Sequence, residues 1–267
     1  MEINKCYNEN CLDTMSKMPD GFIDLTVTSP PYDHLRTYNG YSFDFELVAQ
    51  GLYRVTKQGG VVVWVVGDAT IKGSETGTSF KQALYFKEIG FNLHDTMIYQ
   101  SPKPPLTHNR YEQCFEYMFV FSKGSPTTFN PKTLQTKTFM VNKNYSQRNS
   151  ASSIKEKGAI RNRNEIVTTK KIKQAFNIWY YDIGFNKSTK DTISFEHPAT
   201  FPEKLAYDHI ISWSNKNNLV YDPFMGSGTT AKAAICSNRS WIGSEISKEY
   251  CDIANKRLEP LLNNLFT

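Results

Sequence analysis

The feature that most constrains the fold is an apolar stretch that stops at two adjacent prolines. Residues 23–27 read Ile-Asp-Leu-Thr-Val, and Thr28-Ser29-Pro30-Pro31-Tyr32 follows directly. Proline fixes φ and has no backbone N–H, so a strand cannot continue through Pro30 and Pro31. The stop leaves a hydroxyl, a carbonyl and an aromatic ring at the carboxyl end of a strand, where ligands bind in open α/β sheets. We therefore expect this stretch to hold the amino group of a flat heteroaromatic compound.

Alternating strand and helix patterns along the chain predict an α/β fold with a mostly parallel sheet. Residues 61–66 are entirely apolar, which is typical of a strand buried on both faces of a parallel sheet. The helix before this strand is expected to end at Gly59 and Gly60, because glycine is a common C-cap. The N-terminal half, with a strand pair at its end, predicts a Rossmann-like half with a β-hairpin at its edge. Expected strands span residues 3–7, 23–27, 61–66, 96–99, 116–121, 219–221 and 241–245, and expected helices span residues 12–18, 43–55, 80–89, 203–214, 231–237 and 249–258.

A polar segment, residues 124–194, separates the two α/β halves and carries a concentrated positive charge. Residues 131–175 hold eleven Lys and Arg against two Asp and Glu, a local charge of +9, which leaves the remainder of the chain at −4. A basic segment on a slightly acidic body favours a module that binds a polyanion, although a solvated charged loop has a similar composition. Residues 176–183 are rich in aromatic side chains and are expected to be packed. We expect residues 1–123 and 195–267 to form one domain, with 124–194 inserted.

A second motif is the glycine-bearing stretch Asp222-Pro-Phe-Met-Gly226-Ser-Gly228-Thr-Thr230, between an expected strand and an expected helix. It is neither a dinucleotide fingerprint, because Ala231 stands at the third glycine position, nor a phosphate-binding P-loop. Glu245 ends the next expected strand, about 20 residues on, where α/β nucleotide sites place a carboxylate on ribose hydroxyls. The glycines alone could form a purely structural turn. Together with Glu245 they indicate an adenosine-containing cofactor without a pyrophosphate.

The two motifs together resemble those of the amino-group DNA methyltransferases. T-S-P-P-Y at 28–32 resembles the catalytic motif of that family, and D-P-F-M-G-S-G-T-T at 222–230 resembles its cofactor motif. The resemblance covers nearly the whole chain apart from the basic insert. The catalytic motif comes first, which resembles the permuted β-type order with a target-recognition region between the motifs. The stretch from His197 to Lys204 resembles the family's cofactor segment, whereas Asn10 stands where many relatives carry an acid.

The resemblance implies a Rossmann-like methyltransferase fold and a role for each motif residue. The cofactor would be S-adenosyl-L-methionine, and no metal site is expected. The implied catalytic residues are Ser29, Pro30, Pro31 and Tyr32. The implied cofactor-binding residues are Thr28, Phe201, Asp222, Pro223, Phe224, Gly226, Ser227, Gly228, Thr229 and Glu245. The basic insert supplies the expected DNA contacts, which are Lys155, Lys157, Arg161, Arg163, Lys170, Lys171 and Lys173.

The chemistry expected at the proline motif is methyl transfer to an aryl amine. Hydrogen bonds from the amine to Ser29 Oγ and the Pro30 carbonyl would localise the nitrogen lone pair, which could attack the sulfonium-bound methyl in line. Tyr32 would stack on a base flipped out of the duplex. Relatives with Ser at the first motif position more often modify cytosine N4, and those with Asp more often modify adenine N6. Ser29 therefore favours cytosine, with adenine N6 as the alternative.

Two other functions stay open at this point. The protein could methylate RNA or a protein glutamine, although release-factor enzymes usually carry Asn at the first motif position and place the cofactor motif first. It could also be a catalytically inactive DNA-binding protein on a methyltransferase fold. The intact proline motif, Gly226, Gly228 and Glu245 argue against that second alternative.

The remaining composition predicts a cytoplasmic protein. The five cysteines are scattered without a C-x-x-C pair, which favours free thiols in a reducing compartment. No leader pattern is visible, and the longest apolar run, residues 61–66, is too short to span a bilayer. Duplex DNA is the expected partner, with no membrane. A cognate restriction endonuclease of a restriction-modification system is a further candidate partner, and the choice between monomer and homodimer stays open.

Overall fold

The structure is a computed structural model that describes residues 1–31, 44–102, 111–135, 172–184, 187–197 and 202–263. It divides into two compact units. The larger unit comprises Met1–Asn130 together with Phe176–Thr267, and the smaller unit is Pro131–Ala175. The smaller unit coincides with the segment in which the positive charge is concentrated, and the larger unit contains both sequence motifs.

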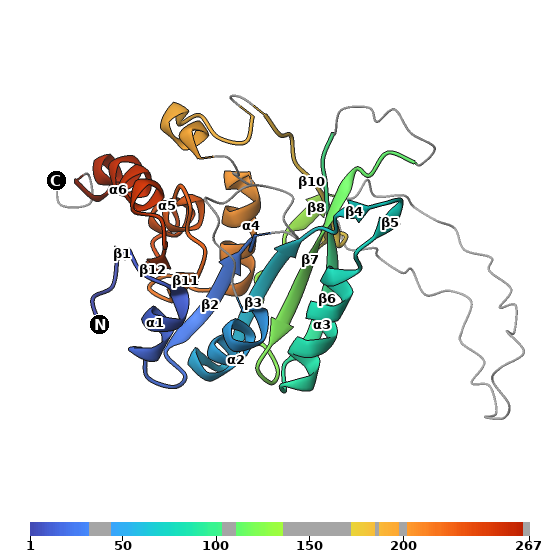
Figure 1. Cartoon of the computed structure of the whole chain (residues 1–267), viewed down its shortest axis with the longest axis horizontal. Coiled ribbons are helices and arrows are strands. Elements are labelled where there is room, and N and C mark those ends of the chain that lie inside the picture. The colour runs from blue at the N-terminus through green and yellow to red at the C-terminus, as the bar shows by residue number, and fades with distance from the viewer. Residues whose placement is uncertain (32–43, 103–110, 136–171, 185–186, 198–201, 264–267) are drawn as a thin grey trace, which may run out of the picture. The chain divides into compact units, whose positions relative to one another are not determined.

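The larger unit is built on one eight-stranded sheet, as the α/β pattern predicts (Figure 1). Within the described sheet only β7 runs against its neighbours, so the sheet is mostly parallel and the predicted hairpin is the β6–β7 pair. In spatial order the strands are β1 (Lys5–Tyr7), β12 (Ser240–Ser244), β11 (Leu219–Asp222), β2 (Ile23–Thr28), β3 (Thr56–Val66), β7 (Phe115–Ser122), β6 (Asn92–Gln100) and β10 (Ile178–Tyr180). A separate two-stranded hairpin pairs β4 (Thr70–Ile71) with β5 (Ser74–Glu75).

Helices cover both faces of this sheet. One face packs against α1 (Cys11–Ser16), α2 (Phe45–Val55) and α3 (Thr78–Glu88). The other packs against α4 (Glu203–Trp213), α5 (Thr229–Cys236) and α6 (Lys248–Asn263). Strand β3 explains the continuous apolar run at 61–66, because Val61, Val63 and Val65 belong to one core and Val62, Trp64 and Val66 to the other. Every side chain of the run is therefore removed from water.

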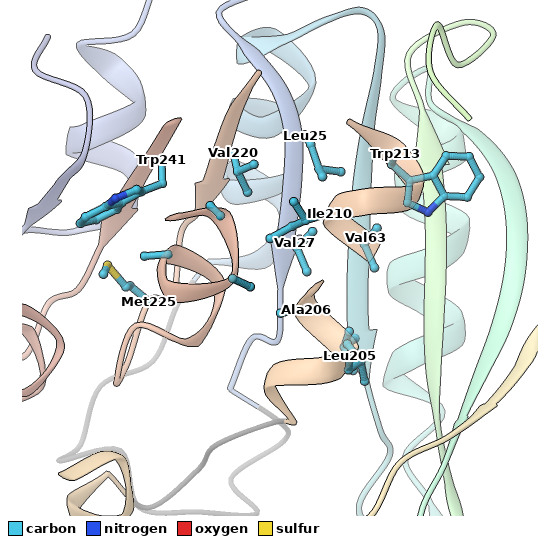
Figure 2. Close-up of a cluster of buried hydrophobic side chains, with 14 of the residues drawn as sticks. Leu25, Val27, Val63, Leu205, Ala206, Ile210, Trp213, Val220, Met225 and Trp241 are labelled. Carbon is cyan, nitrogen blue, oxygen red and sulfur yellow. The ribbon is translucent and has the colours of Figure 1, made fainter. Parts of the chain in front are cut away.

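Figure 2 shows the core between the sheet and α4. Leu25 and Val27 of β2 and Val63 of β3 lie beside Leu205, Ala206 and Ile210 of α4, and all six side chains are buried. Full burial of a Val, Leu or Ile side chain contributes roughly 1.5–3 kcal/mol. The close packing fixes β2, and with it the place where the proline motif begins.

Two local predictions about strands and helices need correction or extension. Helix α2 ends at Val55 and β3 begins at Thr56, so Gly59 and Gly60 lie inside the strand and are not a C-cap. Gly59 has φ +78, and a Cβ there would lie 2.2 Å from Thr127 Cγ2, which explains the glycine. Beyond the hairpin, β10 adds a parallel strand to β6.

The smaller unit is described at its two ends. Strand β8 (Thr133–Gln135) pairs antiparallel with β9 (Ile172–Gln174), and the N–H of Ala175 donates to the carbonyl of Lys132 across 2.7 Å. The chain therefore enters and leaves this unit through neighbouring strands. Residues 124–130 and 176–194, which the sequence prediction includes in the insert, are part of the larger unit. Among the described residues no helix is long and apolar enough to cross a membrane.

Candidate active site at the carboxyl ends of the central strands

The sheet topology brings the two sequence motifs together. Strands β2 and β11 pair in parallel, with Leu25 opposite Val220 and Thr26 opposite Tyr221. Both strands end at the same edge of the sheet, and there the hydroxyl of Thr28 donates to Asp222 Oδ1 across 2.7 Å. The proline motif, Ser29 to Tyr32, follows Thr28 directly in the sequence. The glycine turn, Pro223 to Gly228, follows Asp222 directly. The carboxyl ends of two neighbouring parallel strands are a general location for ligand sites in α/β proteins.

Asp222 is a buried carboxylate that holds the start of the glycine turn. Its Oδ1 accepts from Thr28 and from the backbone N–H of Phe224 at 3.1 Å. Burial raises the pKa of Asp222 to about 6, and the hydrogen bonds oppose that rise. The helix that follows is also fixed to β2, because the Thr230 hydroxyl donates to the Val27 carbonyl across 3.1 Å. Both ends of the turn are thus tied to the strand that carries the proline motif.

The turn itself depends on glycine at two positions. Gly226 and Gly228 have φ values of +50 and +81, in the left-handed region that side chains disfavour. A Cβ on Gly226 would lie 2.9 Å from His197 Nε2, so the backbone and the imidazole approach closely. The N–H of Met225 donates to the Ser244 carbonyl across 2.9 Å and fixes the turn to β12. Gly228 is the N-cap of α5, whose first N–H groups begin here.

Glu245 lies directly after β12, and its carboxylate accepts a hydrogen bond from the backbone of the glycine turn. Its Oε2 accepts from the N–H of Gly226 at 2.8 Å, and its Oε1 accepts from the N–H of Ser247 at 2.9 Å. Burial raises the pKa of Glu245, and these backbone hydrogen bonds oppose the rise. Each carboxylate oxygen has a further lone pair, so the ionised group can also accept from a hydroxyl. A carboxylate beside a closely approached glycine backbone fits the ribose of an adenosine-type cofactor.

The comparison with protein families agrees with this arrangement. The family model described as DNA methylase matches residues 23–256, which include both motifs. The chain belongs to the DNA methylase family. The predicted recognition as an amino-group DNA methyltransferase that uses S-adenosylmethionine is confirmed. The methyl donor of this methylase is S-adenosyl-L-methionine, as the sequence motifs predict.

Relatives of this methylase cover most of its length. The chain is 60% identical over 241 residues to the orphan methyltransferase M.BamHII of Bacillus amyloliquefaciens, covering 90% of each chain. It is 27% identical to the type II methyltransferase M.BglII of Bacillus subtilis, covering 99% of this chain and 72% of the relative.

Solved structures share the fold. The PvuII DNA methyltransferase (cytosine-N4-specific) aligns with a TM-score of 0.67 at 20% identity, covering 97% of this chain and 91% of that one. A DNA modification methylase of Thermus thermophilus, complexed with S-adenosyl-L-methionine, aligns with a TM-score of 0.64 at 20% identity, covering 96% and 93%. The predicted α/β methyltransferase fold is thereby confirmed.

Most of the predicted site residues in the described part of the methylase lie close to one another along this sheet edge. Ser29, Pro30 and Pro31 follow β2 directly, and Pro30 is buried. The described cofactor candidates lie at the ends of β2, β11 and β12, in the glycine turn and at the start of α5, and they are Thr28, Asp222, Pro223, Phe224, Gly226, Ser227, Gly228, Thr229 and Glu245. Tyr32 and Phe201 lie outside the described residues. So do Lys155, Lys157, Arg161, Arg163, Lys170 and Lys171, whereas Lys173 belongs to β9.

Asn10 and Arg257 are two positions whose hydrogen-bond partners become visible in the fold. Asn10 is the N-cap of α1, where its Oδ1 accepts from the N–H of Leu12 at 2.9 Å. Arg257 on α6 has a side chain that is 1% exposed and donates to the glycine turn. The sequence offered one signal for Arg257, because the arginine falls on the apolar stripe of α6 with Ile253, Ala254 and Leu258.

Proposed function

We propose that this DNA methylase transfers the methyl group to the exocyclic N4 of cytosine, at a specific site in duplex DNA, with the target base flipped out of the duplex. The observation that carries the proposal is the position of Ser29-Pro30-Pro31. These residues follow β2 directly, at the same edge of the sheet as Asp222 and Glu245. Ser at the first motif position favours cytosine by the family resemblance. The fold alone is compatible with either cytosine N4 or adenine N6.

The proposed chemistry relies on acceptors that the chain supplies at the proline motif. Ser29 Oγ and the Pro30 carbonyl accept hydrogen bonds from the target amino group, which removes its lone pair from conjugation with the ring. S-adenosylmethionine, when bound, would supply a methyl group on a positively charged sulfonium sulfur. The amine lone pair would form the new C–N bond as the S–CH3 bond breaks, the sulfur would keep that bonding pair as a neutral thioether, and the methylated nitrogen would lose one proton to solvent. Orientation of the two reactants accounts for much of the rate in such a transfer.

The cofactor residues have distinct proposed roles. Glu245 accepts from the ribose hydroxyls, while the backbone of Gly226 to Gly228 allows close approach of the methionine part. Thr28 and Asp222 brace the strand ends on which both motifs depend. Phe201 and Tyr32 are proposed, from the resemblance, to contact the adenine ring and the target base.

The basic insert is proposed to bind the DNA. Its concentrated positive charge, +9 over residues 131–175, suits a polyanion and predicts binding that weakens with salt. The expected contacts are the seven lysines and arginines from Lys155 to Lys173 named above. The partner in this proposal is duplex DNA, and the compartment is the cytoplasm. A cognate restriction endonuclease stays a prediction, and the choice between monomer and homodimer stays open.

The decisive experiment identifies the methylated nucleoside. The purified protein is incubated with amplified, unmethylated duplex DNA and S-adenosylmethionine carrying a labelled methyl group, and the DNA is digested to nucleosides. We expect the label in N4-methylcytosine. Label in N6-methyladenine would overturn the choice of base, and absence of label from DNA containing all sequence contexts would overturn the proposed activity. Sequencing the methylated DNA then gives the recognition site.

Adenine N6 is the second candidate. The two acceptors at Ser29 and Pro30 suit the amino group of either base, because both are exocyclic amines on a flat ring. The same digestion decides between them. A parallel incubation with single-stranded RNA of matched sequence tests the more distant alternative, and labelling confined to DNA is expected.

A further inference from the structure

Arg257 contacts the glycine turn through one edge of its guanidinium. Its Nη1 donates to the Ser227 carbonyl at 2.8 Å, to Ser227 Oγ at 3.2 Å and to Thr229 Oγ1 at 3.1 Å. All three acceptors lie within the turn or in the first residue of α5. These contacts fix both the backbone and the side chains of the turn between Gly226 and the helix.

The other edge of the same guanidinium contacts a different part of the chain. Nε donates to Asp191 Oδ2 at 2.9 Å, and Nη2 donates to Glu203 Oε1. Asp191 is the N-cap of a 3-10 helix, η1 (Thr192–Glu196), and Glu203 begins α4. The two carboxylates therefore lie at the start of η1 and at the start of α4, on either side of His197 in the sequence. One arginine links these two positions to the glycine turn.

The ion cluster around Arg257 is balanced in charge. Lys232 of α5 donates to the same two carboxylates, to Asp191 Oδ2 at 2.6 Å and to Glu203 Oε1 at 2.8 Å. Two cations thus face two anions. Burial acts to raise the pKa of Asp191, but the hydrogen bonds from Lys232 and Arg257 outweigh it and lower the pKa overall. Within this described cluster the arginine reaches the turn, whereas the lysine contacts the two carboxylates and balances their charge.

We propose that Arg257 is a positioning residue for the cofactor site, which sets the spacing between the glycine turn and the described residues Asp191 to His197 and Glu203. The inference rests on the proposed assignment of those two segments to S-adenosylmethionine. The planar fork of arginine can donate in two directions at once, whereas the ammonium of lysine is a point charge on a flexible stem. The charge alone is therefore insufficient for this role.

The test compares two substitutions in the same cluster. Arg257→Lys keeps the positive charge but loses the planar fork of donors. Because charge-assisted hydrogen bonds to the turn are lost, we expect the dissociation constant for S-adenosylmethionine to rise about tenfold or more. Lys232→Gln removes contacts with the same carboxylates and leaves the arginine on the turn, and we expect its dissociation constant to stay within about threefold of wild type. Calorimetric titration of the cofactor and thermal unfolding are measured for each variant.

Kinetics separate positioning from a general loss of fold. In Arg257→Lys we expect KM for S-adenosylmethionine to rise while kcat at saturating cofactor stays within about twofold. Asp191→Asn provides a second test at a partly exposed position, since it removes the charge of one of the two carboxylates that hold the arginine and substitutes no residue of the turn. We expect its dissociation constant to rise by several-fold.

Two outcomes would overturn the inference. The first is wild-type cofactor affinity in both Arg257→Lys and Asp191→Asn, and the second is equal loss of affinity in Lys232→Gln. If Arg257→Lys does not fold, Asp191→Asn compared with Lys232→Gln decides the question alone. Failure of the wild-type protein itself to bind S-adenosylmethionine would instead contradict the proposed function.

Discussion

The hydroxyl of Thr28 donates to the carboxylate of Asp222 across 2.7 Å, although 194 positions separate the two residues in the chain. This contact joins the last residue of β2 to the last residue of β11. The proline motif and the glycine turn begin at the next positions. One buried hydrogen bond therefore fixes the relative position of the residues proposed to hold the amine and those proposed to hold the methyl donor.

Thr28→Val is expected to lower the free energy of unfolding by about 1–3 kcal/mol, because the buried carboxylate of Asp222 loses a donor. Thr26→Val is the matched control. Thr26 is a fully buried threonine of the same strand whose hydroxyl has no hydrogen-bond partner among the described residues. We expect that control to be neutral or stabilising in urea denaturation. Equal losses in the two variants would contradict a specific role for the Thr28–Asp222 contact.

The raised pKa of Asp222 predicts a particular dependence of stability on pH. Burial raises this pKa from 3.8 to about 6, so ionisation is less favourable in the folded protein than in the unfolded chain. The free energy of unfolding is therefore highest, as far as Asp222 is concerned, below about pH 4. It falls as pH rises through about 6, by roughly 3 kcal/mol in total, because each unit of pKa shift corresponds to about 1.36 kcal/mol.

Asp222→Asn should remove that dependence. Denaturation of wild type and variant at several values between pH 4 and 7 gives the difference between their free energies of unfolding. We expect the free energy of unfolding of the wild type to fall relative to that of the variant as pH rises. A difference that does not vary with pH would show that Asp222 titrates near its ordinary pKa in the folded protein.

Gly226→Ala is expected to weaken cofactor binding and to destabilise the fold. The substitution places a Cβ at φ +50 and 2.9 Å from His197 Nε2. Gly73→Ala is the control, because Gly73 also has positive φ, +81, but a Cβ there would meet nothing within 4 Å. The strain at Gly73 should cost about 1–2 kcal/mol and leave cofactor affinity unchanged. The excess loss in Gly226→Ala then measures the contact with His197.

Ser29→Ala is expected to lose turnover while retaining cofactor binding, because the hydroxyl contacts the target amine in the proposed chemistry. Tyr32→Ala is expected to behave in the same way through loss of base stacking. Steady-state methylation of duplex DNA and calorimetric titration of S-adenosylmethionine give the two quantities. Loss of cofactor binding in both variants would mean that the two motifs are assigned to the wrong roles.

We expect that the insert can be shortened without loss of the fold of the larger unit. Gln135 and Ile172 face each other at the end of the β8–β9 pair, so an Asn-Gly turn can replace residues 136–171. We expect wild-type affinity for S-adenosylmethionine. DNA affinity should fall, and the slope of log K against log salt should flatten by up to about 5 units, since six of the predicted phosphate contacts are removed.

A full-length variant with the same six lysines and arginines changed to Gln controls for length. Its DNA affinity should match that of the shortened protein. Binding of DNA with an unchanged salt slope in both variants would place the nucleic-acid contacts elsewhere on the chain.

Much of the sheet could be predicted because parallel strands that are buried on both faces have continuous apolar sequences. The run at 61–66 and the proline stop after residue 27 located β3 and β2 within a few residues. Strand β10 was harder to predict, because only Trp179 of its three residues is buried and the strand follows a polar segment. Gly59 and Gly60 do not mark the helix end, since Gly59 is required by contact with Thr127 and Gly60 by contacts with Thr56 and Lys57 of its own strand and with Asp24 of β2.

The motif residues of the candidate site could also be predicted, but their partners could not. Asp222 and Glu245 stand in recognisable positions after strands, so their presence follows from the pattern. Their hydrogen bonds to Thr28 and Gly226 depend on strand pairing and on the turn conformation. The partners of Arg257 lie in separate segments of the chain, and no local spacing brings such residues together.

The pairing of β2 with β11 also determines when this protein can finish folding. Leu25 lies opposite Val220, 195 positions later, so on the ribosome β2 has only one of its two native neighbours until most of the chain is made. At about 5–20 residues per second, that interval lasts roughly 10–40 s. An apolar strand edge stays open throughout, and it invites wrong pairing. The nascent chain should therefore depend on chaperones until β11 emerges, and truncation before Leu219 should give an insoluble product.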